Sequence, residues 1–467
     1  MSRQASTMPS FTAAAIPVPS RPVPSRPIEK SARGVPAKKA WHRFSKHPAL
    51  MPYFRWFALA VLLNLWLLHY GLTQTTWWSD AHGAIASLSY LALGNFAVAI
   101  FFRQHYVINT LFRLATRAPV SWPLSIRWAM GKVYHFGGWH SGCATMGTLW
   151  FIAYTYALTL NWRNGDASQA TLIVSMMLVG LLLSMVVMAL PAIRSRYHNH
   201  FELIHRLGGW SSLLLFWLQT ILVTRDMYPT EALGPVLLSS PSFWLLGLIT
   251  FSIILPWLRL RKVAVDISRP SSHVAVARFD YGVKPFAGSS TSLSFSPLRE
   301  WHSFANVPAP NESGFRLVIS RAGDWTGRFI DNMPSHVWVK AIPTAGVGNV
   351  DQLFKRVLWV ATGSGIGPCL PHLLAKTAPS HLVWSTRHPE ATYGEALLGE
   401  IMASQPDAIV WDTDAKGKPD MLRLVRHAYA RFQPEAVICI SNKKLTYRVV
   451  YDMESRGIPA FGAIWDS

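Results

Sequence analysis

Six long runs of apolar residues fill most of the first half of the chain. They lie near 53–73, 83–102, 141–161, 170–191, 210–224 and 241–258. A helix of about 20 apolar residues is long enough to cross the ~30 Å hydrocarbon core of a bilayer, and several of the runs approach that length. The pattern therefore predicts a transmembrane helical domain over 49–262.

The residues on either side of this region follow other patterns. Residues 1–48 are rich in Pro, Ser, Ala, Arg and Lys without apolar periodicity, so we expect a disordered basic tail. From residue 263 onward, short alternating runs are separated by Gly, Pro and Asn; they lie near 274–279, 292–295, 315–320 and 337–342. Such runs predict an antiparallel β-barrel over 263–345.

The last part of the chain alternates between apolar strands and helical segments. The strands are expected near 357–361, 381–385, 409–412 and 436–440, and the helices near 366–376, 394–403, 419–432 and 445–456. This order predicts a doubly wound α/β domain with a parallel sheet over 346–467. The expected fold is thus multi-domain: a six-helix bundle, a β-barrel and an α/β domain.

The charges suggest an orientation. The formal net charge is +20, which alone would also fit a nucleic-acid-binding protein. The cations, however, gather in the connections at 103–140 and 193–209 and on the two flanks of the apolar region. Because cytoplasmic loops are rich in Lys and Arg, we expect an integral multi-pass membrane protein with both termini in the cytoplasm, in the plasma membrane or an endomembrane, with the lipid bilayer and no nucleic acid as partner.

Two sequence features limit the other classes of protein. No compact apolar stretch with a small-residue cleavage site follows the start, so a removable signal peptide is not expected. The three cysteines, Cys143, Cys369 and Cys439, are far apart and form no Cys-x-x-Cys pair. A disulfide scaffold, an iron–sulfur cluster and a structural zinc site are therefore not expected.

A glycine-rich turn follows the first strand of the expected α/β domain. Gly363, Gly365 and Gly367 lie between an apolar strand and a helical segment, and Pro368 follows them. Backbone N–H groups and the helix dipole at such a helix start can hold a diphosphate, and proline is compatible with the first helical turn. The turn alone is weak evidence, because glycines supply any tight backbone bend.

A second segment makes the turn more informative. Residues 321–326 read Arg-Ala-Gly-Asp-Trp-Thr and lie upstream of the glycines. Together, and following the apolar helices, the two segments resemble the cytosolic half of the ferric reductase/NADPH oxidase family, which has a ferredoxin-NADP reductase-like module. The turn at 367–371 and the histidine pattern below are most similar to the fungal TmpA-like membrane flavoproteins. The resemblance implies FAD and NADPH as cofactors.

The resemblance also implies a set of cofactor-binding residues. They are His302, Ser303, Phe304, Arg321, Thr326, Gly363, Gly365, Gly367, Pro368, Ser385 and Arg387. The first three would lie against the flavin ring, the next two near the FAD diphosphate, and the last two near the adenosine ribose, where an arginine favours the 2′-phosphate of NADPH. Ser303 and Ala305 depart from the family's proline and hydroxyl residue. The alternative for 301–305 is an ordinary barrel strand.

Two further residues would lie near the reacting rings in such a module. Cys439 keeps the cysteine that family members carry beside the nicotinamide, and Trp465 or Phe461 would shield the flavin by stacking. Each has a simpler alternative. Cys439 is equally well a small buried residue, and an aromatic near the end of the chain equally well belongs to a core strand.

The histidines of the apolar helices bear on haem binding. The third helix offers His135 and His140, and the fifth offers His198, His200 and His205. All five lie at the expected cytosolic end, so an outer haem is not expected. A single inner haem b between His135 or His140 and His205 is one interpretation, and histidines at a lipid headgroup interface are the other.

These features together suggest a function. We expect an integral-membrane flavoprotein oxidoreductase that passes hydride from NADPH to FAD and electrons to an unidentified cytosolic or membrane acceptor, in redox signalling, developmental regulation or secondary metabolism. One alternative is a non-catalytic membrane regulator that keeps a flavin- and nucleotide-binding fold. A transmembrane ferric reductase is the third interpretation, although it needs outer haem ligands that the sequence lacks.

Overall fold

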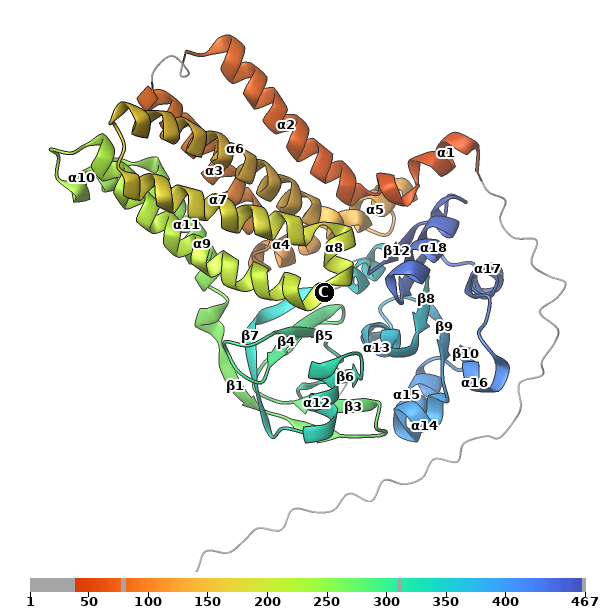
Figure 1. Ribbon diagram of the computed structural model, residues 1–467. Helices are drawn as coiled ribbons and strands as arrows, with labels where there is room; N and C mark the ends of the chain where they lie inside the picture. The colour runs from red at the N-terminus through yellow and green to blue at the C-terminus, as the bar shows by residue number, and fades with distance from the viewer. Residues whose placement is uncertain (1–37, 77–80, 309–312, 464–467) are drawn as a thin grey trace, which may run out of the picture.

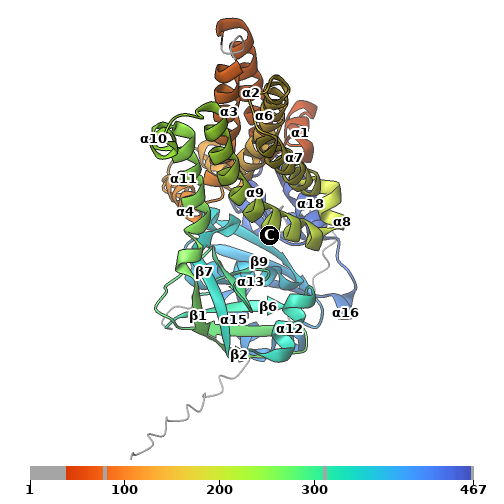
Figure 2. The same ribbon diagram turned by 60° about the vertical axis from the view of Figure 1, so that its left-hand side comes forward.

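The computed structural model describes residues 38–76, 81–308 and 313–463. In it a bundle of long helices lies beside a mixed half made of three sheets and shorter helices (Figure 1). Figure 2 shows the bundle on one side of the sheets, with the chain passing from α11 into β1. Most of the expected tail and Trp465 lie outside the described residues.

The six expected apolar helices are present. They are α2 (Pro52–Gln74), α3 (Ala81–Phe101), α6 (Gly137–Asn164), α7 (Gln169–Ala189), α9 (His198–Met227) and α11 (Pro241–Ile254). Among the described residues, six helical segments are long and apolar enough to cross a membrane: Pro52–Gln74, Gly83–Phe101, Leu124–Asn164, Gln169–Ala189, His198–Met227 and Pro241–Arg259. Length and composition are the only support for a membrane span.

Close packing and a polar network join the first helices of the bundle. Gly142 of α6 lies so near α2 that an added Cβ would be 2.7 Å from the Cβ of Ala60. The side chains of Asn64 in α2 and Asn95 in α3 exchange two amide hydrogen bonds of 3.0 and 2.8 Å, and Trp150 Nε1 donates to Asn64 Oδ1 at 2.8 Å. All three side chains are buried, so these bonds satisfy polar groups that have no access to water.

Short helices surround the bundle. They are α1 (Ala40–Ser45), η1 (Pro48–Leu50), α4 (His105–Thr116), α5 (Leu124–Met130), η2 (Gly131–Phe136), α8 (Pro191–Arg196), α10 (Leu233–Ser239) and η3 (Trp257–Arg259). The first two correct the expectation of disorder up to residue 48. Lys38 N donates to Ser455 O at 3.0 Å, and a ring nitrogen of His42 lies 3.0 Å from Glu454 O, so contacts with the far end of the chain order this segment.

The antiparallel region consists of two sheets and one helix. One sheet has the order β1-β7-β4-β5 and the other β2-β3-β6. The strands are β1 (Arg261–Ala264), β2 (Asp266–Ser268), β3 (Val274–Phe279), β4 (Ser289–Ser294), β5 (His302–Ala305), β6 (Phe315–Ser320) and β7 (His336–Ala345), and the helix is α12 (Asp324–Asn332).

The two antiparallel sheets do not close into the expected β-barrel. Between the two sheets the described residues make one isolated bridge, from Val307 to Arg316, and no continuous ladder. The inner faces share one core with α12, in which Phe279, Leu293 and Phe329 are fully buried. Because the helix fills part of this core, the sheets pack across it without closing on each other.

The α/β half has the expected parallel sheet. Its strands are β8 (Val357–Thr362), β9 (Ser380–Thr386), β10 (Ile409–Asp412), β11 (Ala436–Ile440) and β12 (Ala460–Gly462), in the order β10-β9-β8-β11-β12. The helices are η4 (Val347–Leu353), η5 (Gly363–Gly365), α13 (Ile366–Ala375), α14 (Pro389–Tyr393), α15 (Glu395–Ser404), α16 (Thr413–Lys416), α17 (Met421–Phe432) and α18 (Lys443–Glu454). Strand order reverses between β8 and β11, which is the topological switch point of a doubly wound sheet.

A buried arginine connects the helical half to the α/β half. Arg127 of α5 is 3% exposed. Its guanidinium donates to Leu353 O at 2.8 Å and to the two carboxylate oxygens of Glu435 at 2.7 and 3.1 Å. Burial raises the pKa of Glu435, but the Arg127 guanidinium and the N–H of Lys355 outweigh it and hold the pKa below its usual value. This bidentate pair therefore stays charged. The contacts of Arg127 with Leu353 O and Glu435 are called the joint below.

Replacing this arginine should loosen the joint. We expect Arg127→Ala to cost about 2 kcal/mol of stability, because it removes a buried guanidinium with its hydrogen bonds and leaves the partly buried Glu435 carboxylate without its partner. The melting temperature of the purified chain measures the loss. Arg117→Ala, an exposed arginine on the neighbouring connection, should change stability by less than about 0.5 kcal/mol. Equal melting temperatures for the two variants would contradict this role for Arg127.

Candidate nucleotide-binding site

The carboxyl ends of the parallel strands open into a cavity of about 960 Å³. It is bounded by β8 and β9, by the loops before α16 and α17, and by the start of α18. The wall includes Thr362, Gly363, Ser385, Thr386, Arg387, His388, Thr413, Asp414, Lys418, Asp420, Asn442 and Arg448. Ligands of doubly wound folds bind at this edge of the sheet.

The glycine turn reaches this cavity through one residue. Gly363 has a φ of +48°, in the region that favours glycine, and it lines the wall. At Gly365 an added Cβ would be 2.1 Å from Ile440 O, and at Gly367 it would be 3.3 Å from Val318 O. Pro368 lies in the first turn of α13. The last three residues thus allow the turn to pack against β11 and β6, and they do not line the cavity.

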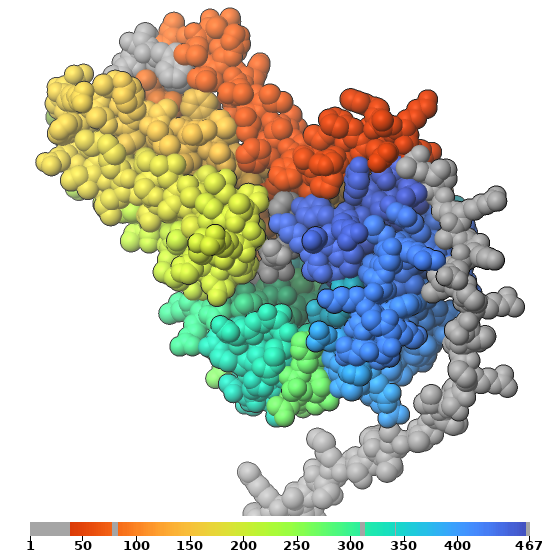
Figure 3. Space-filling view, turned by 45° about the vertical axis from the view of Figure 1, so that its right-hand side comes forward, coloured from red at the N-terminus to blue at the C-terminus, as the bar shows by residue number. Residues whose placement is uncertain are grey.

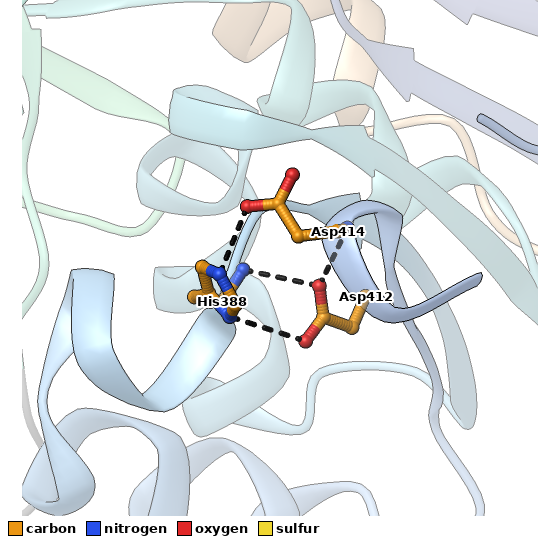
Figure 4. A group of neighbouring side chains, drawn as sticks. All are labelled: His388, Asp412 and Asp414. Carbon is orange, nitrogen blue, oxygen red and sulfur yellow. Dashed lines mark hydrogen bonds and ion pairs between the residues drawn. The ribbon is translucent and has the colours of Figure 1, made fainter. Parts of the chain in front are cut away.

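The end of β9 supplies a polar wall. Ser385 is buried and lines the cavity, whereas the Arg387 side chain is 80% exposed, with Nε 3.9 Å from an oxygen of Asp414. His388 contacts two carboxylates: Nε2 lies 3.2 Å from Asp414 and Nδ1 lies 3.8 Å from Asp412 (Figure 4). The N–H of Asp414, with those of Ala415 and His388, lowers the pKa of Asp412.

His388, Asp412 and Asp414 are also the one group of three metal-ligand types that the described residues bring together. Their ligand atoms lie within 4.8 Å of one another. His388 and Asp414 are exposed, and Asp412 is partly exposed. Because the imidazole of His388 contacts the carboxylates of both Asp412 and Asp414, the three residues form an ion-pair cluster at the cavity rim.

Cations outnumber carboxylates on the cavity wall. Arg387, Lys418 and Arg448 face Asp414 and Asp420. The Asp420 carboxylate accepts the N–H groups of Leu422 and Arg423 and thereby caps α17. Within the described part of the chain, Lys418 and Arg448 form no ion pair, so both are available to an anionic ligand. The sequence analysis missed these two cations, although their places after β10 and β11 would have suggested the sheet edge.

The residues expected beside a flavin ring lie in and next to β5. Phe304 stacks on Trp325 with ring centroids 5.7 Å apart, and the ring of His302 lies 4.7 Å from the same indole. His302 Nε2 is buried without a hydrogen-bond partner, and burial lowers the pKa of this imidazole. Ser303 points to the other face, where its hydroxyl lies 2.7 Å from that of Ser292.

The two residues expected at the FAD diphosphate have other partners. Arg321 donates to both carboxylate oxygens of Asp331 and to Ser272 O. The Thr326 hydroxyl accepts the N–H groups of Ala322 and Gly323 and caps α12. In this structure the two side chains therefore stabilise the 321–326 turn, and neither is free for a phosphate.

The two residues expected near the reacting rings do not meet at the cavity. Cys439 is fully buried in β11 against α17 and α18, and burial raises its pKa to about 12. Phe461, the other aromatic considered as a flavin shield, is fully buried in β12 and packs on Phe354 at 5.3 Å. Trp465 lies outside the described residues. The structure favours the simpler alternatives for Cys439 and Phe461.

The histidines considered for a haem fall into two groups. His140 Nδ1 lies 2.9 Å from Ala99 O, and its ring lies 6.3 Å from that of His205. His135 is separate from this pair: it lies in η2, is 1% exposed and lines a second cavity beside α2.

Comparisons with known proteins identify similar reductases. The family model described as adenylate-forming reductase 03009, C-terminal domain, matches residues 347–467. Adenylate-forming reductases 06235 and 03009 of Coprinopsis cinerea are each 42% identical to this chain over 424 residues. The match covers 90% of this chain and 41% of each relative, so the chain spans less than half the length of the curated relatives it matches.

Solved structures of reductases are similar to part of this chain. A ferredoxin NADP+ reductase from Neisseria gonorrhoeae, solved with bound FAD and NADP, is 14% identical, with a TM-score of 0.36 over 44% of this chain and 98% of that chain. The ferredoxin reductase of carbazole 1,9a-dioxygenase has the same identity and TM-score over 44% of this chain and 70% of that chain. Such scores are low, so the architecture rests on the strand order described above.

These relatives overturn the expected function. They are adenylate-forming reductases, and neither relative is named a membrane ferric-reductase-like flavoprotein. The expected electron route to an unidentified acceptor, the membrane regulator and the transmembrane ferric reductase were therefore wrong. The comparisons also do not show a relation to the TmpA-like family, and they give a haem no support. The two motifs identified a type of nucleotide-binding module, and one such module serves many unrelated reactions.

The burial of the cysteines predicts their reactivity. Burial raises the pKa of Cys439 to about 12 and that of Cys369 well above its usual value, and Cys143 is 4% exposed. Because the thiolate is the reactive form, we expect no reaction of the native chain with a disulfide reagent at pH 8 and reaction of all three thiols after unfolding in detergent.

A Ser303→Cys variant is the matched control, since its added thiol is exposed and should react at once. Fast reaction of one native thiol that disappears in Cys439→Ala would show that Cys439 is accessible and would contradict its position in the core.

Proposed function

We propose that this chain is the nucleotide-binding reductase part of an adenylate-forming reductase and that it takes NADP(H) in the cavity at the carboxyl edge of its parallel sheet. The relatives' name joins two activities, adenylate formation and reduction. The compound reduced would be the adenylate or a product made from it. The described architecture fits the reductase part, because a doubly wound sheet with a glycine turn at its switch point suits a dinucleotide.

One observation carries the proposal. The Gly363 turn, the buried Ser385 and the two cations Lys418 and Arg448, which form no ion pair with any described residue, converge on one cavity of about 960 Å³. A dinucleotide needs a surface for its diphosphate, polar groups for its riboses and a compensating positive charge. These needs are met by residues of the glycine turn, the end of β9, the loop before α17 and helix α18.

Each group on the wall would have a separate task. Gly363 lets the backbone approach the diphosphate closely, because no side chain stands in the way. Lys418 and Arg448 would balance the phosphate charge, and Arg387 would reach a 2′-phosphate at the rim. Asp414 opposes that last contact, since its carboxylate lies beside Arg387. NADP(H) supplies hydride when bound; the protein would bind and orient it.

We also propose that the aromatic surface formed by His302 and Phe304 of β5 with Trp325 can hold the flavin of FAD. The half-buried Phe304 offers an aromatic face, and the buried His302 Nε2 lacks a hydrogen-bond partner. A flavin oxygen or nitrogen would satisfy this ring nitrogen. Arg321 would have to leave Asp331 before it could meet the diphosphate.

Direct binding separates the reductase part from the adenylate-forming part. The purified chain should bind NADP+ and its fragment 2′-AMP in a calorimetric titration, and it should not catalyse ATP–pyrophosphate exchange. Exchange activity without nucleotide binding would show that the chain carries the other part of its relatives' function.

Two substitutions at the rim should change cofactor preference in opposite directions. Arg387→Ala removes a cation from the 2′-phosphate and should weaken NADPH about tenfold with little effect on NADH. Asp414→Asn removes the opposing charge and should strengthen NADPH by about two- to fivefold. Arg423→Ala, which lies in α17 outside the cavity, is the control. If Arg387→Ala weakens both cofactors equally, the 2′-phosphate assignment fails.

The flavin proposal has its own test. Phe304→Ala should reduce the fraction of chains that retain FAD after reconstitution, measured by visible absorbance, because it removes the stacking surface. Phe286→Ala removes an exposed ring elsewhere and should have no effect. If the wild-type chain takes up no FAD, the flavin proposal is wrong, and the NADP(H) proposal is unaffected.

A further inference from the structure

A second cavity, of about 1150 Å³, lies between the N-terminal helices and α18. It is lined by α1, η1, α2, α4, α5, η2, α6 and α18. Figure 3 shows the red N-terminal segment against the blue C-terminal segment, with the orange α2 rising beside them. The cavity therefore lies where the apolar helices meet the α/β half.

Aromatic and aliphatic side chains make up most of its wall. Trp56 stacks on Trp139 with centroids 5.8 Å apart, and Phe102 stacks on the other side of Trp139 at 6.0 Å. Leu59 and Leu62 of α2 also line the cavity, and their side chains are 44% and 61% exposed on the outer face of that helix. An alkyl chain could follow this continuous apolar surface out of the cavity.

The polar groups of the wall are few and mostly positive. The charged residues are Lys46, Arg55, Lys132 and Glu454, three cations and one carboxylate. Glu454 forms an ion pair with Lys132 and accepts a hydrogen bond from Trp128 Nε1 at 3.1 Å. Lys46 and Arg55 are therefore in excess.

Neither of these two cations has a carboxylate partner in the part of the chain that the structure describes. Lys46 Nζ lies 3.8 Å from the ring centre of Trp128, and burial lowers its pKa. Arg55 donates to Ser45 O at 2.6 Å and to Leu50 O at 2.7 Å, which fixes its guanidinium beside the cavity. A half-buried ammonium and a fixed guanidinium suit a phosphate.

One further polar atom is unsatisfied. His135 lines the cavity, is 1% exposed, and its Nδ1 has no hydrogen-bond partner. A buried polar atom without a partner is costly, so a ligand that brings a carbonyl or hydroxyl oxygen to this ring would be stabilised. This group distinguishes the cavity from a plain apolar groove.

We propose that this cavity binds an anionic phospholipid. Its phosphate would lie between Lys46 and Arg55, an ester or hydroxyl oxygen would bond to His135, and its acyl chains would follow Leu59 and Leu62 along α2. The exposed apolar face of α2 and the length of the six apolar helices fit a lipid as the occupant. The proposal does not depend on the nucleotide site.

The test uses the full chain, purified in detergent and delipidated. Dioctanoyl phosphatidate is titrated while tryptophan fluorescence is followed, because Trp56, Trp128 and Trp139 line the cavity. Dioctanoyl phosphatidylcholine and inorganic phosphate are the comparison ligands. We expect saturable binding of phosphatidate, weaker binding of phosphatidylcholine and no binding of inorganic phosphate at the same concentrations.

The variants address the three contacts. Lys46→Met and Arg55→Gln should each weaken phosphatidate about tenfold, and His135→Phe should weaken both lipids to a similar degree. Arg43→Met, an exposed residue of α1, is the matched control. Unchanged binding of NADP+ or, if the chain binds none, an unchanged melting temperature shows that each variant is folded.

Three results would overturn the proposal. Equal affinity of the wild-type chain for phosphatidate and phosphatidylcholine would show that Lys46 and Arg55 do not discriminate between the two headgroups. Competition by inorganic phosphate at the same concentration would reduce the site to a phosphate site. Unchanged phosphatidate affinity in Lys46→Met and Arg55→Gln would place the lipid elsewhere.

Discussion

The arrangement of the two halves depends on a charged hydrogen-bonding joint. Arg127 brings a guanidinium from the helical half into the α/β half, where it meets a backbone carbonyl and the Glu435 carboxylate. A buried cation is tolerated only when its donors are satisfied, so the pair constrains both partners. Lys132 and Glu454 repeat this pattern one turn further along. Both proposed ligand cavities lie next to elements that this joint holds in place.

Local patterns in the sequence were sufficient for most of the secondary structure. The expected strands at 274–279 and 315–320 have the observed bounds, because each is a short apolar run that polar or turn-forming residues delimit. The sequence reading missed α12, which starts inside the Gly-Asp-Trp-Thr segment. It gave a core strand near Phe461 as an alternative, and β12 is such a strand. It also predicted a closed barrel. Pairing between distant strands and the insertion of a helix into their core depend on tertiary packing, which a local pattern does not contain.

In the candidate site, too, some residues could be predicted from local sequence patterns and others could not. Gly363, Ser385 and Arg387 could be placed because each follows the carboxyl end of an expected strand. Arg321 and Thr326 were assigned to a ligand, yet their hydrogen bonds close a turn and cap a helix. Lys418 lies in the loop before α17 and Arg448 in α18, and the approach of both to the cavity depends on the folded sheet. The function could not follow from these residues, since the same module occurs with different reactions and the relatives are much longer than this chain.

The reciprocal amide pair between Asn64 and Asn95 has a consequence for the bundle. Each amide is both donor and acceptor, and Trp150 adds a third contact to one of them. Sliding α2 by one helical turn, about 5.4 Å, would separate the two buried amides and take the acceptor of the Trp150 indole N–H away from it. The network therefore fixes the position of α2 along its axis relative to α3 and α6. A fixed depth of α2 also fixes the position of Arg55, which lies in the same helix and lines the second cavity.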